Sequence, residues 1–273
     1  MATKALLDHN PNPDDQEIKK ALEHNLCRCT GYLRIIDAVK LAGQFIRGET
    51  TPDAVRPDPN GPKIGVSHPR PSSMLKACGL AEFSADIKLQ NALEVAVHRS
   101  TEHHAMITSI DTSVAEKMPG VVGVMTARDI KGTNRIKIVY GDQPILAEDK
   151  VYCLGDAVAI VVANTREQAL AAAAAVKVAY EPLPVLKTPE QAMAPDAIQL
   201  HSEWPNLCFR QPQIRGDAGK ALAESAVVVE GHFSTQCNHQ APLEPEATVA
   251  YIDGEGEDAQ LVVVGRSINI HLH

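Results

Sequence analysis

The stretch that decides the fold is Cys27-Arg28-Cys29-Thr30-Gly31-Tyr32, which places two thiols one residue apart between two segments of helical pattern. A Cys-x-Cys pair is too close to form a disulfide with itself without strain, so its spacing suits a metal cluster better. Two unrelated small buried residues would explain a bare Cys-x-Cys equally well. The flanking residues decide between these two interpretations.

The motif is followed by a helical pattern over residues 34–39, and together they resemble the end of the helical [2Fe-2S] domain of molybdenum hydroxylases. This is the xanthine oxidase and aldehyde oxidoreductase family. The resemblance implies that Cys27 and Cys29 are cluster ligands. In the family an upstream Cys-x-x-Cys pair supplies the other two, and residues 1–26 contain no cysteine. The resemblance therefore implies a fragment with half of the ligands, or a chain that has lost its cluster.

Composition predicts a globular chain and excludes several classes of function. With 273 residues, of which 44% are hydrophobic, about two domains are expected. A net charge of −8 argues against a nucleic-acid surface, because neutralising phosphates needs clustered Lys and Arg. No leader pattern and no long apolar run is present, so we expect no signal peptide, no membrane span and a cytoplasmic protein. The remaining cysteines are expected to be small hydrophobes, not disulfide partners: Cys78, Cys153, Cys208 and Cys237.

The N-terminal segment predicts two helices around the cysteine motif. Asn12 is expected to cap the first helix, with Pro13 at its first helical position and an end near Asn25. The second is predicted from apolar residues at helical spacing, and Gly48 is expected to end it. Those apolar residues are Ile35, Val39, Ala42 and Ile46.

Residues 49–73 predict a linker, because prolines recur through them with hardly any apolar periodicity. Such a segment forms an extended, semi-rigid connector. In xanthine dehydrogenases a flavin domain stands at this place. The resemblance therefore points to the flavin-free aldehyde oxidoreductases and implies that the chain binds no FAD.

Between Met74 and Leu186 the pattern predicts strands alternating with helices. The unbroken apolar run 157–163 predicts a buried strand. Thr165 is expected to start a helix, with Gln168 completing a capping box, and residues 176–180 alternate as a returning strand.

An earlier unit in the same region pairs a predicted short helix, 113–118, with a predicted strand, 121–125. The region resembles the α/β hammerhead domain of the same family. The resemblance lies in His104-Ala105, Ile110-Asp111, Pro119-Gly120-Val121, Val151-Tyr152 and Gly155-Asp156.

The last third predicts strands at 227–233, 246–252 and 261–264, the last two joined through Asp253-Gly254, a hairpin signal. Residues 242–246 resemble the entry into the family's molybdopterin-binding part. The family's pterin-binding loops and general base lie beyond the corresponding point, so we assign no catalytic residue to this chain.

The fold class predicted from these parts is α+β, in a multidomain fragment. Its expected domains are the C-terminal part of the helical [2Fe-2S] domain (1–48), the linker (49–73), the α/β hammerhead domain (74–187) and the truncated start of a mixed α/β molybdopterin-binding domain (188–273).

The resemblance implies a molybdenum-dependent oxidoreductase that hydroxylates aldehydes to carboxylic acids and passes electrons through [2Fe-2S] clusters. It implies molybdopterin cytosine dinucleotide with molybdenum, held mostly outside this chain, so the isolated chain is expected to be inactive. The implied partners are a small aldehyde, an electron-acceptor protein and a second copy in a homodimer of the complete protein.

Two other functions stay open at this point. One is a catalytically inactive hammerhead-fold scaffold or subunit-interaction protein, and the other is a zinc site that uses Cys27 and Cys29 with two histidines. The zinc site is disfavoured because no His-x3-5-His follows. A metal site at His271 and His273 is weaker still, because no third ligand lies near them. Glu244 could be a catalytic carboxylate, but its proline neighbours favour a role in a turn.

Overall fold

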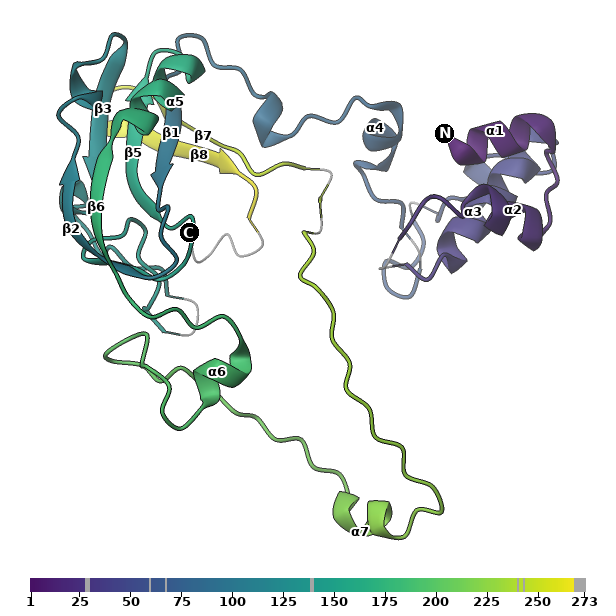
Figure 1. The fold of residues 1–273 in the computed structure, drawn as a ribbon. Helices are drawn as coiled ribbons and strands as arrows, with labels where there is room; N and C mark the ends of the chain where they lie inside the picture. The colour runs from purple at the N-terminus through teal and green to yellow at the C-terminus, as the bar shows by residue number, and fades with distance from the viewer. Residues whose placement is uncertain are drawn as a thin grey trace. The chain divides into compact units, whose positions relative to one another are not determined.

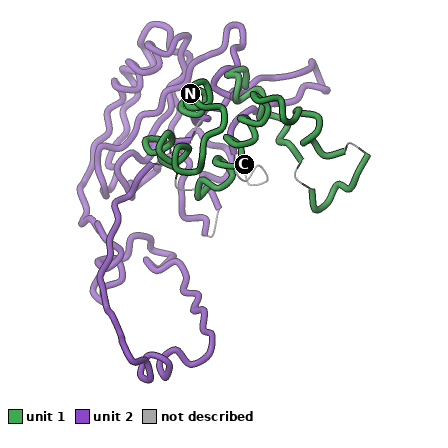
Figure 2. The backbone as a smooth tube through the Cα atoms, turned by 90° about the vertical axis from the view of Figure 1, so that its right-hand side faces the viewer, with its two compact units in different colours: residues 1–81 green, residues 82–273 purple. Residues whose placement is uncertain are grey.

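The computed structural model describes residues 1–27, 30–58, 60–66, 68–137, 140–239, 241–242 and 244–267. The chain divides into two compact units, residues 1–81 and 82–273, coloured separately in Figure 2. Unit 1 is helical, whereas the strands of the described residues all lie in unit 2. This combination confirms the predicted α+β class.

Unit 1 is built on α1 (Ala2–His9), α2 (Asp15–Ala21) and α3 (Leu33–Ile46), which are drawn in purple and blue in Figure 1. Their apolar faces meet in one small core. Its buried residues are Leu7, Ile18, Leu22, Ile36 and Val39. The second predicted helix is thus confirmed, and Gly48 follows its end with a φ of +72°, in the left-handed region that suits glycine.

The predicted start of the first motif-flanking helix is wrong by two residues. The cap of α2 is Asp14, not Asn12, and its carboxylate accepts hydrogen bonds from the backbone N–H groups of Gln16 and Glu17. Glu17 returns a bond by accepting from the N–H of Asp14 at 2.9 Å. A capping box requires Glu or Gln three residues after the cap. Asp14 has Glu17 at that position, whereas Asn12 has Asp15, whose side chain is one methylene shorter. The helix also ends at Ala21, before the predicted Asn25, and α1 was not predicted.

The remainder of unit 1 contains little regular structure. Where residues 49–72 are described, they form one short 3-10 helix, η1 (Asp53–Val55). Helix α4 (Ser73–Cys78) follows and ends at Gly79, whose φ is +70°. No helix in the described parts of either unit has both the length and the apolar character to cross a bilayer.

Unit 2 contains two three-stranded antiparallel sheets. The first has the order β1-β5-β3 and the second β4-β2-β6. Their bounds are β1 (Glu94–Arg99), β2 (Ala105–Asp111), β3 (Val121–Thr126), β4 (Lys150–Val151), β5 (Ala157–Ala163) and β6 (Lys177–Pro182). β5 confirms the predicted buried strand, β3 the strand predicted at 121–125 and β6 the returning strand.

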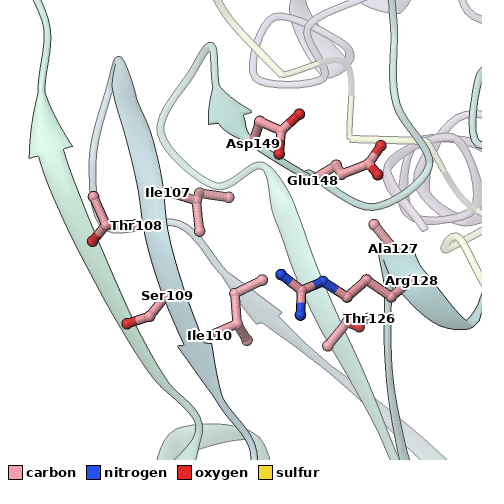
Figure 3. A pocket seen from close by; sticks show the side chains of 9 residues that line it. All are labelled: Ile107, Thr108, Ser109, Ile110, Thr126, Ala127, Arg128, Glu148 and Asp149. Carbon is pink, nitrogen blue, oxygen red and sulfur yellow. The ribbon is translucent and has the colours of Figure 1, made fainter.

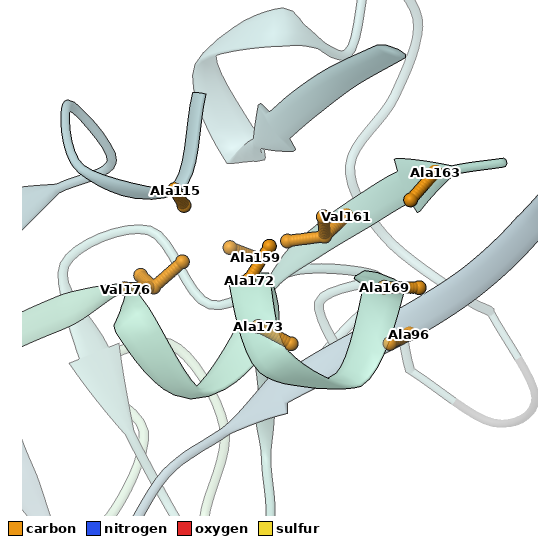
Figure 4. Packing of buried hydrophobic residues seen from close by; sticks show 9 residues of the cluster. All are labelled: Ala96, Ala115, Ala159, Val161, Ala163, Ala169, Ala172, Ala173 and Val176. Atoms are coloured by element: carbon orange, nitrogen blue, oxygen red, sulfur yellow. The ribbon is translucent and has the colours of Figure 1, made fainter. Parts of the chain in front are cut away.

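Helix α5 (Arg166–Ala175) covers one face of the first sheet, and small side chains allow it to lie close (Figure 4). Ala159, Val161 and Ala163 of β5 are fully buried against Ala169 and Ala172 of the helix. Such close packing between a strand and a helix excludes water over the whole contact. The main core of unit 2 lies here.

The capping box predicted for α5 is only half formed. The hydroxyl of Thr165 accepts from the N–H of Gln168 at 3.3 Å, as predicted. The side chain of Gln168 instead lies against Gly120. It lies so close that a Cβ added to this glycine would collide with the amide group of Gln168. Gly120 has a φ of +81°, so both its conformation and its neighbour require the absence of a side chain.

Several other predictions for unit 2 need correction. β1 and β2 follow one another without a helix between them, so strands and helices do not alternate regularly. The short helix predicted at 113–118 is a 3-10 turn, η3 (Ala115–Lys117). Residues 227–233 are exposed and form no strand, because no neighbouring strand of the described chain pairs with them.

The C-terminal hairpin was predicted correctly. β7 (Thr248–Asp253) pairs with β8 (Gln260–Gly265), and Gly254 begins the turn with a φ of +84°. The remaining short elements are α6 (Pro189–Met193), α7 (Ala218–Ala223), η2 (Ser84–Asp86), η4 (Ala127–Asp129) and η5 (Gly256–Asp258).

Replacing Gly120 by alanine should destabilise unit 2 by about 1–3 kcal/mol, because it forces a left-handed alanine against Gln168. Gly123→Ala is the matched control, since nothing lies within 4 Å of its added Cβ and its φ is not positive. Urea unfolding followed by circular dichroism measures both. Equal midpoints for the two variants would contradict the role given to Gly120.

Candidate functional site

The cysteine loop between α2 and α3 is held by Tyr32. The hydroxyl of Tyr32 accepts a hydrogen bond from the backbone N–H of Cys27 at 2.6 Å and donates one to the carbonyl of Asn25 at 2.7 Å. Gly31 and Tyr32 both have positive φ, 59° and 64°. A left-handed tyrosine costs about 1–3 kcal/mol and persists only where its surroundings fix it. These two hydrogen bonds and the start of α3 supply that fixation.

The sulfur of Cys27 also has a partner inside the loop. The hydroxyl of Thr30 donates to Cys27 Sγ at 3.3 Å and accepts from the N–H of Tyr32 at 3.2 Å. Cys27 is half-buried. Hydrogen bonds to a ligating sulfur and partial burial are two of the properties that set the potential of an iron–sulfur centre.

The second predicted ligand, Cys29, lies outside the described residues, so the structure does not place it beside Cys27. Within the described ranges, no three His, Cys, Asp or Glu side chains come together to hold a metal ion. A [2Fe-2S] cluster normally takes four thiolates, and a Cys-x-Cys loop supplies two. The donor set of this loop, soft sulfur with a hydroxyl donor beside it, fits half of such a site.

The sequence predicts that the remaining cysteines serve as small hydrophobes, but all four are exposed: Cys78, Cys153, Cys208 and Cys237. At Cys153, loss of water around the sulfur and the Asp156 carboxylate raise the pKa to about 11. Its thiol donates to Asp156 Oδ1 at 2.9 Å. Cys153 is therefore a neutral thiol at physiological pH, which makes it a poor nucleophile.

Other residues that the sequence analysis named have contacts that support the fold. His104 is buried, and its Nδ1 donates to the carbonyl of Pro184 at 2.5 Å. Asp253 ends β7, and Gly254 begins the turn to β8. His271 and His273 lie outside the described residues.

Sequence reasoning missed a cluster of aromatic rings on unit 2. Tyr152, just after β4, stacks on His201 with ring centroids 4.2 Å apart and an interplanar angle of 13°. Trp204 meets His201 edge-on at 6.0 Å, and Tyr140 lies 6.0 Å from Trp204. The residues come from segments far apart in sequence, so no local motif could have revealed them.

Polar contacts fasten the segment around His201 to the sheets. Lys150 Nζ donates to the carbonyl of Leu200 at 2.8 Å and lies 5.0 Å from the centroid of the Tyr152 ring. The Tyr140 hydroxyl donates to the carbonyl of Cys208 at 2.8 Å. Burial lowers the pKa of Lys150 and raises that of Tyr152.

A hollow of 190 Å³ lies between β2, η4 and the residues before β4. In Figure 3 the guanidinium of Arg128 extends toward Ile110, with Glu148 and Asp149 across the hollow. No residue that the sequence analysis singled out as a ligand lines it.

Comparison with known protein families places the chain. Residues 1–40 match the [2Fe-2S] binding domain, residues 78–184 match the aldehyde oxidase and xanthine dehydrogenase a/b hammerhead domain, and residues 200–273 match the molybdopterin cofactor-binding domain. The cysteine motif lies in the first of these segments. The chain belongs to the molybdenum hydroxylase family that contains aldehyde oxidoreductases and xanthine dehydrogenases.

Individual relatives agree with this assignment. The chain is 37% identical over 291 residues to an aldehyde oxidoreductase of Megalodesulfovibrio gigas, covering 100% of the chain and 32% of that protein. It is 35% identical to the large molybdopterin subunit of a nicotinate dehydrogenase of Eubacterium barkeri, over 76% of the chain and 48% of the relative. The crystal structure of the aldehyde oxidoreductase from Desulfovibrio desulfuricans matches with a TM-score of 0.75 and 40% identity, over 100% of the chain and 32% of that structure.

Burial lowers the pKa of His201, with Asp142 raising it and Lys150 and Arg135 lowering it further. The unfolded chain, whose histidine pKa is about 6.5, therefore takes up the proton first as the pH falls. Acidification from about pH 7.5 to about pH 5 should weaken the Tyr152–His201 stack. The fluorescence of Trp204, the single tryptophan, reports it.

His201→Phe keeps a flat ring and should abolish this pH response, whereas His232→Phe, an exposed histidine of the same unit, should leave it intact. A response that survives in His201→Phe would mean that another group is responsible.

Proposed function

We propose that the chain is the electron-transfer and framing part of a molybdenum-dependent oxidoreductase that hydroxylates aldehydes to carboxylic acids. The observation that carries this proposal is the Tyr32-clamped cysteine loop, which lies in a segment matching a [2Fe-2S] binding domain. The identity to an aldehyde oxidoreductase, which spans the entire chain, supports the aldehyde substrate and the reaction.

Cys27 and Cys29 are the proposed thiolate ligands. When bound, the molybdenum cofactor supplies the hydroxylation chemistry and the [2Fe-2S] cluster supplies one-electron transfer. Tyr32 fixes the backbone at Cys27, and Thr30 donates to its sulfur. These contacts orient the sulfur before iron binds and thus reduce the ordering that binding requires.

The proposal extends to the form of the cofactors. Residues 41–77 separate the first two matched segments, and domains seldom have fewer than about 50 residues. This spacing supports an enzyme without a FAD domain at that place. We propose molybdopterin cytosine dinucleotide as the form of the pterin, held mostly by residues outside this chain.

The proposed partners are a small aldehyde, an electron-acceptor protein and a second copy in a homodimer of the complete enzyme, which would be cytoplasmic. The net charge of −8 supports a protein that does not bind nucleic acid. The chain spans about a third of the length of the aldehyde oxidoreductase it matches, so these partners belong to the whole protein.

Anaerobic reconstitution with iron and sulfide tests the ligand assignment. The chain should take up less than one cluster per monomer, because the loop offers half of the thiolates. Cys27→Ser should abolish the uptake, whereas Cys78→Ser, an exposed cysteine outside the loop, should not change it. Visible absorption and electron paramagnetic resonance measure the cluster.

Unchanged uptake in Cys27→Ser would show that this cysteine is structural. A stable, stoichiometric cluster in the monomer would refute the half-site assignment.

The purified chain should show no aldehyde-dependent dye reduction, with or without added molybdopterin. Because it spans 32% of the related aldehyde oxidoreductase, we expect the shell of residues that positions the metal and the base to be incomplete. Metal analysis beside the assay provides the control. Molybdenum-dependent turnover would show that the site is already present in these residues.

A further inference from the structure

Two hollows border the Tyr152–His201 stack of unit 2. The larger has a volume of 350 Å³ and the smaller 150 Å³. Both are lined by Asp142, Pro144, Tyr152 and His201. A volume of 350 Å³ lies at the lower end of the range in which proteins bind small molecules.

The walls suit a flat, apolar ring. The larger hollow combines the two stacked rings with the apolar side chains of Ile136, Ile145 and Ala147. Trp204 borders the smaller hollow. Aromatic faces and edges favour offset stacking or edge-on contact with another ring.

Each hollow is lined by one arginine of its own, and the carboxylate of Asp142 lines both hollows. Arg99 borders the larger hollow, and its Nη1 donates to the carbonyl of Gly155 at 2.9 Å. Arg135 borders the smaller, and its Nη1 donates to the carbonyl of Asn134 at 2.8 Å. Each backbone bond orients the guanidinium and leaves further N–H groups for a ligand.

Asp142 is half-buried, and the described residues provide it with no hydrogen bond or ion pair. Asp156, the other carboxylate of the larger hollow, already accepts from the N–H groups of Tyr152 and Cys153 and from the thiol of Cys153. Glu203 at the smaller hollow is exposed to water. Asp142 is therefore the carboxylate with acceptor capacity at the stack.

We propose that these hollows form a binding site for a small neutral aromatic amide. The ring would lie against Tyr152 and His201, its amide carbonyl would accept from Arg99 or Arg135, and its amide N–H would donate to Asp142. A carboxylate on the ring would face Asp142 and an ammonium would face a guanidinium, so either charged analogue loses one of the two polar contacts. The site is independent of the proposed oxidoreductase function, because it uses none of its ligands.

Three ligands of matched size test the proposal: benzamide, benzoate and benzylamine. Trp204 is the only tryptophan of the chain, so its fluorescence and its single indole N–H resonance both report on this place. Benzamide should change both signals saturably. Benzoate and benzylamine should bind at least about fivefold more weakly, because each meets one repulsive charge.

Asp142→Ala should weaken benzamide binding at least about tenfold, since it removes the charged acceptor of the amide N–H. Asp258→Ala, a carboxylate in η5 of the hairpin, is the matched control and should bind like the unaltered chain. Circular dichroism establishes that both variants are folded.

The proposal would be overturned by no saturable response to benzamide, by equal affinity for the three ligands, or by unchanged affinity in a folded Asp142→Ala variant. Equal loss in Asp258→Ala would also overturn it, because the effect would then be one of net charge.

Discussion

Unit 2 depends on the burial of β5, which is complete on the face toward α5 and reaches Val158 on the opposite face. Ala159, Val161 and Ala163 face α5, whereas Val158 belongs to the core beneath the second sheet. Ile110 and Val178 pack against both clusters and join them. Removing a valine side chain from water contributes about 1.5–3 kcal/mol, so a polar residue at either face of β5 would loosen both sheets.

A second, local constraint shapes the cysteine loop of unit 1. The left-handed conformation of Tyr32 directs its ring back so that its hydroxyl reaches the residues before α3, Cys27 and Asn25. The strain of a non-glycine residue in this conformation is offset by these hydrogen bonds. Within the described residues, Tyr32 thus holds the backbone of Cys27 and Thr30 contacts its Sγ, both from the same loop.

The aromatic cluster around His201 shows a different kind of organisation. Lys150 and Tyr152 flank the end of a two-residue strand, β4, and both reach across to the segment that follows α6. Asn206 closes that segment on itself by donating to the carbonyls of Ala192 and Ile198. The start of the segment that matches a molybdopterin cofactor-binding domain is in this way tied to the sheets of the hammerhead segment.

The sequence by itself determined the elements whose signals are local. An unbroken apolar run predicts β5, a threonine cap predicts α5 and Asp253-Gly254 predicts the hairpin, because backbone conformation and burial are encoded within a few neighbouring residues. The cap of α2 was predicted at the wrong residue, because both Asn12 and Asp14 can cap a helix and the contact with Glu17 selects Asp14. The ligand role of Cys27 and Cys29 stays a prediction, with Cys29 outside the described residues.

Only the tertiary structure decided which segments pair, which side chains are buried and which distant residues form a common surface. The strand predicted at 227–233 is absent because a strand needs a hydrogen-bonded neighbour, which its own sequence cannot supply. The cysteines outside the loop are exposed because burial depends on where the chain places them. The hollows beside Tyr152 and His201 exist because folding brings β4 and residues 201–204 side by side across about fifty positions of sequence, and hydrophobic patterning does not record such pairings.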